Sequence, residues 1–220
     1  MLEVDIQKRL PDFVLDVSFS TEQEIVVLFG PSGSGKTTIL NSIAGLVHPD
    51  GGHISLNGRT FYSAGQKPLA VQKRNVGYLF QDYALFPHMT VSQNIRYGLR
   101  KGHELHLEPL LTTVGIDHLL DKYPHQLSGG QKQRVALVRA LATEPDILLL
   151  DEPLSALDTA TRKQCQDELL RLHEMWGIPF LLVTHDRDEA EKLGDTILLM
   201  ENGRIVEASA QKSHTATSSS

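Results

Sequence analysis

The sequence predicts an α/β fold in which a mostly parallel sheet is interrupted by one helical insertion. Short apolar runs alternate with stretches of helical periodicity, a pattern typical of βαβ units. Two of these runs, Ile25–Phe29 and Ile147–Leu150, are apolar at every position, as expected of parallel strands that are buried on both faces. From about Asp82 to Tyr123 the pattern turns helical instead. We therefore predict one α/β core whose two halves flank a helical segment.

The N-terminal half is predicted to combine the first core strand with a small antiparallel sheet. Turn signals at His48–Gly52 and at Asn57-Gly58 separate short apolar runs, as expected of strands joined by tight turns. The expected elements are strands over Leu2–Ile6, Val14–Phe19, Ile25–Phe29, His53–Asn57 and Val76–Phe80, and a helix over Thr38–Gly45.

The C-terminal half returns to alternating strands and helices after the insertion, within which Leu105–Leu120 has helical spacing. An Asn202-Gly203 turn between two apolar runs predicts a closing hairpin. The polar residues 209–220 predict a disordered tail. The expected elements are helices over Gly129–Ala142 and Ala160–Met175, and strands over Ile147–Leu150, Phe180–Thr184, Thr196–Met200 and Arg204–Glu207.

Composition excludes several classes of protein. The 220 residues are 40% hydrophobic and 22% charged, which is ordinary usage for a globular domain. No apolar stretch approaches the roughly 20 residues that span a bilayer, and no apolar signal core opens the chain, so we expect no export. A single cysteine, Cys165, precludes an internal disulfide framework. The formal charge of −6 argues against a broad nucleic-acid surface, which requires a basic face.

A glycine-rich loop joins the first core strand to the helix after it. Its sequence, GPSGSGKT, has the Gly-x-x-x-x-Gly-Lys-Thr spacing of a phosphate loop. Glycines let backbone N–H groups point inward, and the helix N-terminus adds positive potential. Lys36 is expected to reach the β- and γ-phosphates, and the Thr37 hydroxyl to hold Mg²⁺. The strand and helix on either side disfavour a plain surface turn. The predicted nucleoside triphosphate site comprises Gly30, Pro31, Ser32, Gly33, Ser34, Gly35, Lys36, Thr37 and Thr38.

Two acids end the second core strand. Apolar runs of parallel strands stop where the active-site edge of the sheet begins. Asp151 is placed there to complete the metal site begun by Thr37. Glu152 would then lie beside the γ-phosphate and orient or deprotonate the attacking water. A helix cap or solvated turn is the alternative for an isolated acid pair, but the phosphate loop upstream disfavours it.

The run LSGGQ, residues 127–131, opens the next helix. Ser128 and Gln131 have the spacing of a capping box, so the run could be only a well-formed helix start. Two glycines in a first turn weaken a helix, however. Gly129 and Gly130 are explained if a phosphate approaches the backbone N–H groups closely.

These motifs together resemble the ATP-binding cassette ATPases of ABC transporters, over about residues 1–208. The loop matches the Walker A motif, Ile147–Asp151 the Walker B strand, and LSGGQ the family's signature letter for letter. The resemblance implies a P-loop NTPase (RecA-like) core, 1–81 and 135–208, with an antiparallel β subdomain and an inserted helical signature subdomain, 82–134. It further implies roles for Gln81 (metal and nucleotide sensing), Glu152 (catalysis), Asp158 (nucleotide contact) and His185 (γ-phosphate contact), beside Ser128, Gly129, Gly130 and Gln131.

The family's usual adenine-stacking aromatic is missing from Gln7–Asp12. Phe13 is nearby, but as part of the apolar run Phe13-Val-Leu it is predicted to lie on the sheet face. We therefore expect weak ATP binding and a preference over GTP within roughly tenfold. The alternative is that Phe13, the permease or a second subunit supplies the aromatic platform.

The same resemblance implies partners. Two copies would face each other head to tail, each ATP lying between one phosphate loop and the other copy's Ser128–Gly130. A separate transmembrane permease, and indirectly a solute-binding protein, would complete an importer at the cytoplasmic face of the membrane. The segment Val76–Val91 is similar to importers of small oxyanions, ferric iron and related solutes, and within that group Arg74–Tyr78 with Asn94–Gly98 is most similar to molybdate importers. Importers of ferric iron, sulfate or polyamine are alternatives, and a soluble ABC ATPase acting on nucleic acid is less favoured.

Overall fold

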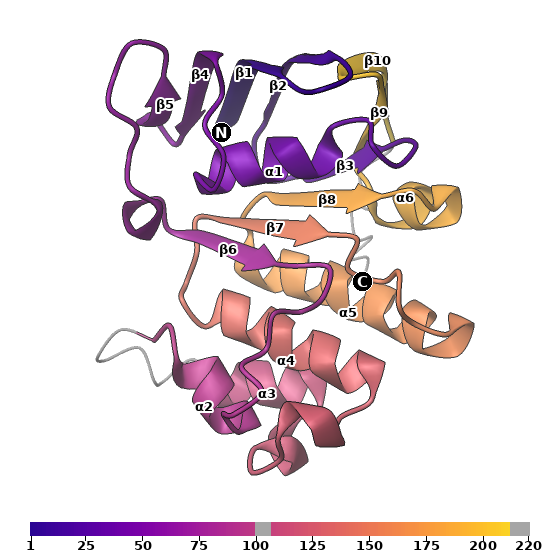
Figure 1. Cartoon of the computed structure of the whole chain (residues 1–220). Helices are drawn as coiled ribbons and strands as arrows, with labels where there is room; N and C mark the ends of the chain where they lie inside the picture. The colour runs from indigo at the N-terminus through magenta and orange to yellow at the C-terminus, as the bar shows by residue number, and fades with distance from the viewer. Residues whose placement is uncertain (100–106, 212–220) are drawn as a thin grey trace, which may run out of the picture.

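The computed structural model describes residues 1–99 and 107–211. Figure 1 shows an antiparallel sheet at the top, helix α1 (Lys36–Ala44) beneath it, then a second sheet, and further helices below. The antiparallel sheet has the strand order β2-β1-β4-β5. Its strands are β1 (Leu2–Arg9), β2 (Val14–Thr21), β4 (Gly51–Leu56) and β5 (Arg59–Ser63).

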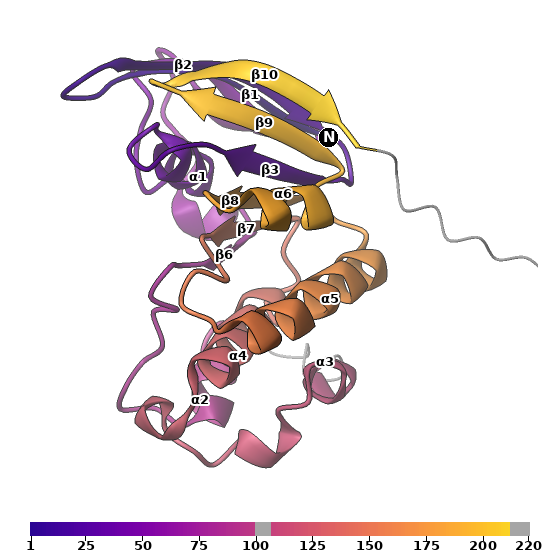
Figure 2. The ribbon, with the colours of Figure 1, turned by 90° about the vertical axis from the view of Figure 1, so that its right-hand side faces the viewer.

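The second sheet contains the core strands and has the order β10-β9-β3-β8-β7-β6. All neighbours are parallel except β10, which pairs antiparallel with β9. Figure 2 shows β10 lying beside β2, so the closing hairpin joins the two sheets. The strands are β3 (Ile25–Phe29), β6 (Val76–Leu79), β7 (Ile147–Asp151), β8 (Phe180–Thr184), β9 (Thr196–Glu201) and β10 (Arg204–Ala210).

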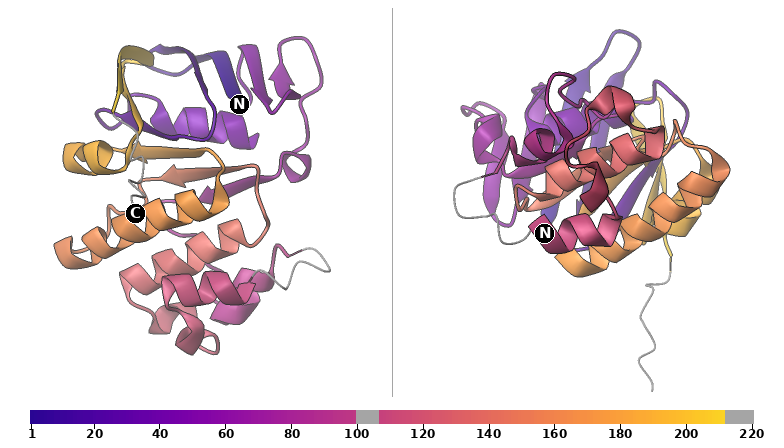
Figure 3. Two further views of the ribbon diagram at one scale, coloured as in Figure 1. Left: turned by 180° about the vertical axis from the view of Figure 1, so that it is seen from behind. Right: turned by 90° about the horizontal axis from the view of Figure 1, so that it is seen from below.

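The remaining helices cover the face of the second sheet that is turned away from α1, as Figure 3 shows from behind and below. Helices α2 and α3 lie between β6 and β7 in the chain, as an insertion. None of the helices in the described ranges is both long and apolar enough to cross a membrane. The helices are α2 (Val91–Arg96), α3 (Leu107–Val114), α4 (Gly129–Leu141), α5 (Thr159–Trp176) and α6 (Arg187–Leu193), with 3₁₀ turns at Val71–Lys73, Asp117–Leu119 and Pro124–Gln126.

The second sheet separates two hydrophobic cores. Side chains alternate between the faces of a strand, so neighbouring residues of β3 enter different cores. Val26 and Leu28 pack with α1 and the antiparallel sheet, whereas Ile25 and Val27 pack with α4, α5 and the insertion. The phosphate loop follows β3 and therefore starts from a strand that is fixed on both faces.

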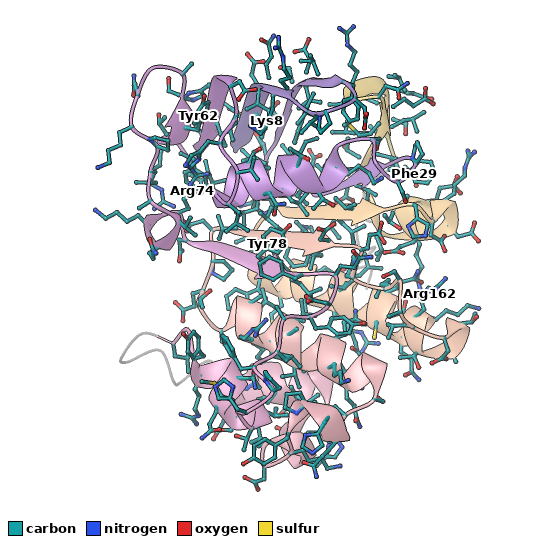
Figure 4. All side chains as sticks on the ribbon, in the orientation of Figure 1. Lys8, Phe29, Tyr62, Arg74, Tyr78 and Arg162 are labelled. Carbon is teal, nitrogen blue, oxygen red and sulfur yellow. The ribbon has the colours of Figure 1, made fainter. Side chains whose placement is uncertain are left out.

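One buried cation links the upper layers. Arg74 is fully buried, and Figure 4 shows it beside the end of α1. Its guanidinium donates to the carbonyl oxygens of Ser42 (2.8 Å) and Ile43 (2.7 Å), near the end of that helix. It also donates to the carbonyls of Leu69 (3.1 Å) and Phe61 (3.2 Å). Arg74 thereby satisfies carbonyls that a helix end leaves without partners.

The α/β prediction is confirmed, with three local differences. Strand β10 extends to Ala210, so residues 209 and 210 belong to the sheet and not to a tail; 212–220 lie outside the described residues. The predicted helical spacing over Leu105–Leu120 becomes α3 and a short 3₁₀ turn, because Gly115 adopts a left-handed φ of 65° and ends the helix. Leu105 itself lies outside the described residues. Strand β5 and helix α6 were not predicted.

Candidate functional site

The phosphate loop wraps the start of α1. Gly33 and Gly35 have φ angles of 81° and 102°, a left-handed region that glycine enters without a steric penalty. At Gly30 a Cβ would overlap the carbonyl oxygen of Met200 on β9. The N–H of Gly203 donates to the carbonyl of Ser34 at 3.1 Å, so a hydrogen bond from the β9–β10 turn fixes the backbone of the phosphate loop. The glycines therefore serve both the bend and its close packing.

Lys36 lies folded against the loop that precedes it. Its ammonium donates to the carbonyl oxygens of Gly30 (2.8 Å) and Pro31 (2.7 Å). The side chain is buried, and this desolvation lowers the pKa of Lys36, while the charges of Glu152 and Asp151 oppose the change. A cation is thus held at the centre of the loop, between backbone carbonyls and two acids.

Thr37 and Asp151 come from different elements and meet at the carboxyl end of β7. The Thr37 hydroxyl donates to Asp151 Oδ1 at 3.0 Å. The phenol of Tyr78 on β6, labelled in Figure 4, donates to Asn41 Oδ1 at 3.1 Å and lies 3.5 Å from Asp151 Oδ2. Burial raises the pKa of Asp151, and the Thr37 hydrogen bond opposes this. Burial also raises the pKa of Tyr78, so the phenol remains a neutral donor.

Glu152 lies between the two other predicted catalytic side chains. The Gln81 amide donates to Glu152 Oε2 at 3.1 Å, and His185 Nδ1 lies 3.3 Å from Glu152 Oε1. Glu152 has a left-handed φ of 46°, its N–H donates to the Val183 carbonyl at 3.0 Å, and its own carbonyl accepts from Ser155. The backbone of this acid is therefore fixed on both sides while its carboxylate remains partly exposed.

An open cleft of about 440 Å³ lies over the phosphate loop, within the usual range for a small-molecule site. Gln81, Glu152 and Phe13 are among its lining residues. The interpretation of Phe13 as a residue of the sheet face was wrong: it precedes β2, which begins at Val14 as predicted, and its ring packs against Gly203 of the hairpin turn. The cleft is lined by Leu10, Pro11, Asp12, Phe13, Ser32, Gly33, Gly35, Lys36, Thr37, Thr38, Gln81 and Glu152.

The signature residues do not line this cleft. Ser128 and Gln131 form the capping box of α4: the Ser128 hydroxyl accepts from the Gln131 N–H at 3.3 Å, and the Gln131 side chain accepts from the Ser128 N–H at 3.0 Å. A Cβ at Gly130 would lie 2.6 Å from Thr161 Cγ2 on α5, so any larger residue would force Thr161 or its helix to shift. At Gly129 the nearest atom would be 3.6 Å away, and this residue is exposed. Helix packing therefore explains one of the two glycines.

Asp158 is also outside the cleft and caps α5. Its carboxylate accepts from the Thr161 hydroxyl at 2.6 Å and from the N–H groups of Ala160 and Thr161, each at 3.1 Å. These hydrogen bonds lower the pKa of Asp158. Asp158 therefore does not contribute to the lining of the cleft in its own chain.

A partly buried network of polar side chains next to His185 was missed in the sequence. Arg162, labelled in Figure 4, connects α5 to α6: it donates to Asp186 Oδ2 (3.2 Å) and to the Leu157 carbonyl (3.1 Å). The Thr184 hydroxyl donates to Glu189 Oε2 at 3.1 Å and accepts from the Asp186 N–H at 3.0 Å. Only the short spacing of charged residues after His185 could have indicated it.

Comparisons with known proteins point to the same family as the sequence motifs. The family model for ABC transporters matches residues 14–155. The molybdenum import ATP-binding protein ModC of Haemophilus influenzae is 46% identical over 207 residues, 93% of this chain and 59% of that protein. The molybdate/tungstate import ATP-binding protein WtpC of Archaeoglobus fulgidus is 46% identical over 210 residues, 94% and 85% of the two chains. This chain thus spans about three fifths of ModC and most of WtpC.

Other relatives and solved structures agree. The sulfate/thiosulfate import ATP-binding protein CysA of Caulobacter vibrioides is 48% identical over 194 residues, 83% of this chain and 55% of that protein. A dimeric ATP-binding cassette, solved in a post-hydrolysis state with ADP and Pi, superposes with a TM-score of 0.82 at 29% identity over 97% of this chain and 100% of that chain. The resemblance that the motifs indicated is thereby confirmed: this chain belongs to the ABC transporter family and has the fold of its ATP-binding cassettes.

Proposed function

We propose that this chain is the ATP-hydrolysing subunit of an ABC importer and that it dimerises on ATP to drive solute uptake through a separate permease. One observation carries the proposal: Glu152 lies between Gln81 and His185 at the rim of the phosphate-loop cleft. A carboxylate held in this way can orient a water and accept its proton.

The cleft fits the triphosphate of ATP. In this proposal Lys36 leaves the carbonyls of Gly30 and Pro31 for the β- and γ-phosphates, and the loop N–H groups bind the phosphate oxygens. The hydroxyl of Thr37 and the carboxylate of Asp151, 3.0 Å apart, are hard oxygen donors of the kind that suits Mg²⁺, with Gln81 at the edge of the same cleft. When bound, Mg²⁺ neutralises phosphate charge.

The chemical step then depends on residues of this chain. Glu152 takes a proton from the attacking water as its oxygen bonds to the γ-phosphorus, and the bond to the β,γ-bridging oxygen breaks with its electron pair on ADP. His185 turns from Glu152 to the γ-phosphate. Gln81 keeps the carboxylate aligned.

The dimer would complete the site. Ser128 and Gly129 are exposed at the start of α4 and do not line the cleft of their own chain. They are thus free to bind the ATP of a second copy, together with Gly130, Gln131 and Asp158. The N–H groups at a helix N-terminus stabilise γ-phosphate charge best where water is excluded. The dimeric cassette with similar fold supports this arrangement.

A glutamine in place of the proposed base tests the function. Glu152→Gln should retain ATP binding, slow hydrolysis by roughly 10²–10⁴-fold, and trap a dimer with MgATP that light scattering detects as a doubled mass. Lys36→Ala, which removes the phosphate cation, is the control and should remain monomeric. Normal turnover by Glu152→Gln would exclude its role as the base.

Phe13 is the proposed platform for adenine, which revises the expectation of weak discrimination. Stacking of a base on an aromatic ring is worth about 1–3 kcal/mol, or roughly 5- to 150-fold in affinity. Phe13→Ala should lose that affinity for ATP, measured by competition with labelled nucleotide, while Phe19→Ala on β2 controls for loss of an aromatic ring. Equal ATP affinities of Phe13→Ala and wild type would indicate that another subunit supplies the aromatic platform for adenine.

The solute is proposed to be molybdate or a related tetrahedral oxyanion. The relatives named above import molybdenum, molybdate or tungstate, and sulfate or thiosulfate. The proposed partners are a second copy, a transmembrane permease and, indirectly, a solute-binding protein, at the cytoplasmic face of the membrane. Uptake of labelled molybdate by proteoliposomes containing the complete complex, with sulfate as competitor, tests the choice. Transport of sulfate alone would reassign the solute.

A further inference from the structure

The turn that follows Gln81 is held in an unfavourable conformation. Tyr83 and Ala84 have φ angles of 63° and 43°. This is a left-handed region that residues with a Cβ avoid. They are consecutive, and Gln81 lies two residues before the first of them. The path of this turn therefore sets where the Gln81 amide lies relative to Glu152, 3.1 Å away.

Arg139 on α4 holds both strained residues. Its guanidinium donates to the carbonyl of Ala84 at 2.6 Å and to that of Tyr83 at 2.8 Å. The same group lies 5.6 Å from the centroid of the Phe86 ring, within the range of a cation–π contact. From within the turn, Asp82 Oδ1 accepts from the Ala84 N–H at 3.1 Å. One side chain thus binds both carbonyls that the left-handed backbone turns toward α4.

The chain beyond the turn is fixed independently. Asn94 on α2 accepts from the Phe86 N–H at 2.8 Å and donates to the carbonyls of Phe86, Met89 and Thr90 at 3.0–3.1 Å. Strand β6 fixes the chain as far as Leu79. Between these two anchors the Tyr83 N–H donates to the Phe80 carbonyl at 2.8 Å and the Tyr83 side chain is buried, while Arg139 holds the carbonyls of Tyr83 and Ala84.

A second arginine on α4, Arg134, makes an ordinary helix–helix contact and serves as a comparison for Arg139. Arg134 makes a bidentate ion pair with Glu168 on α5, with distances of 3.0 and 2.7 Å. Arg134 stabilises packing and does not contact the turn. Arg139 instead donates to main-chain oxygens of the segment that positions Gln81.

We propose that Arg139 is a positioning residue for ATP hydrolysis, which holds the left-handed Tyr83–Ala84 turn and thereby aligns Gln81 with Glu152. The inference rests on the proposed function, since it concerns the same hydrolytic site. Because Arg139 lies on the helix that Ser128 caps, it also ties the position of Gln81 to that of the signature residues. A shift of α4 in a dimer then changes the alignment of Gln81 with the Glu152 carboxylate.

Kinetics of the full chain test the positioning role. Arg139→Gln should lower kcat for MgATP by between about tenfold and a hundredfold, the effect of a misplaced catalytic contact. Its Kd for MgATP should remain within about twofold of wild type, because Arg139 does not line the cleft. Arg134→Gln is the matched control and should retain kcat. Equal kcat values for the two variants would overturn the proposal. Should Arg139→Gln not fold, Arg139→Lys takes its place, since a single ammonium nitrogen cannot match the fixed, planar spacing of the two guanidinium nitrogens that donate to Tyr83 and Ala84.

A glycine rescue separates positioning from mere packing. Ala84 is exposed, so Ala84→Gly removes backbone strain without removing buried contacts. The double variant with Arg139→Gln should regain at least threefold in kcat, whereas Ala84→Gly should leave Arg134→Gln unchanged. Failure of the rescue would show that Arg139 acts by packing.

A double-mutant cycle identifies the residue through which Arg139 acts. In a Gln81→Ala background, Arg139→Gln should cost less than about twofold in kcat, because both changes remove one alignment. Fully additive losses would overturn the route through Gln81. Absence of hydrolysis by the wild-type chain would instead refute the proposed function itself, so the two failures are distinguishable.

Discussion

Glu189 is the buried acid for which we expect the largest effect of pH on stability. It lies on α6, is only 4% exposed, and its Oε2 accepts from the Thr184 hydroxyl. Its pKa is raised to about 7, mainly by burial and to a smaller extent by Asp186, while the Thr184 hydrogen bond, Arg162 and His185 act in the opposite direction. Within the described part of the chain, Glu189 Oε1 has no hydrogen-bond partner. The neutral carboxyl is thus the form that this site favours.

The sign of the effect follows from proton linkage. An acid whose pKa is raised on folding binds its proton more tightly in the folded state, so stability falls as pH rises between the unfolded and folded pKa values. For Glu189 that window runs from about 4.5 to about 7. The full penalty, present above the folded value, is about 3 kcal/mol at 1.36 kcal/mol for each pH unit between the two pKa values. Glu189→Gln keeps an acceptor for Thr184 and removes the ionisation.

Urea unfolding of wild type and Glu189→Gln at pH values from 5 to 8.5 measures this directly. The unfolding free energy of the variant, relative to wild type, should increase by about 2–3 kcal/mol across the range. Glu191→Gln, an exposed charge on the same helix, is the control for loss of one negative charge. A difference between Glu189→Gln and wild type that stays constant with pH would refute the reasoning.

Two further predictions concern stability. Arg74→Met should lower the unfolding free energy by at least about 2 kcal/mol, because it removes the donors to the Ile43 and Leu69 carbonyls; an unchanged urea midpoint would contradict this. Gly130→Ala should cost about 1–3 kcal/mol, because its Cβ would lie 2.6 Å from Thr161 Cγ2, whereas Gly129→Ala should stay within about 1 kcal/mol of wild type. Equal urea midpoints for the two alanine variants would show that α5 yields to the added methyl group.

The sequence predicted most of the core because the signals there are local. A strand buried on both faces is apolar throughout, so Ile25–Phe29 and Phe180–Thr184 were predicted with the bounds that the structure has. The start of α4 at Gly129 followed from its capping box. Such elements depend on neighbours a few residues away.

Contacts between distant segments could not be predicted in the same way. Phe13 was placed on the sheet face because of its apolar neighbours, but Gly203 of the β9–β10 turn, 190 residues later in the chain, supplies the surface on which its ring packs. Likewise, Gly130 was explained by phosphate approach alone, because nothing near it in the sequence reveals Thr161 on the facing helix. Helix α6 is seven residues long and rich in charge, so its apolar stripe is too short to detect.

The two-core arrangement has a consequence for how the chain can change over evolutionary time. Because consecutive residues of β3 belong to different cores, the core that a substitution disturbs should alternate residue by residue along this strand. Substitutions in the helical layer can be compensated by changes at Ile25 and Val27. Val26 and Leu28 meanwhile continue to pack against α1, which follows the phosphate loop. Surfaces on the helical side can therefore diverge to suit new neighbours, and the nucleotide side need not follow.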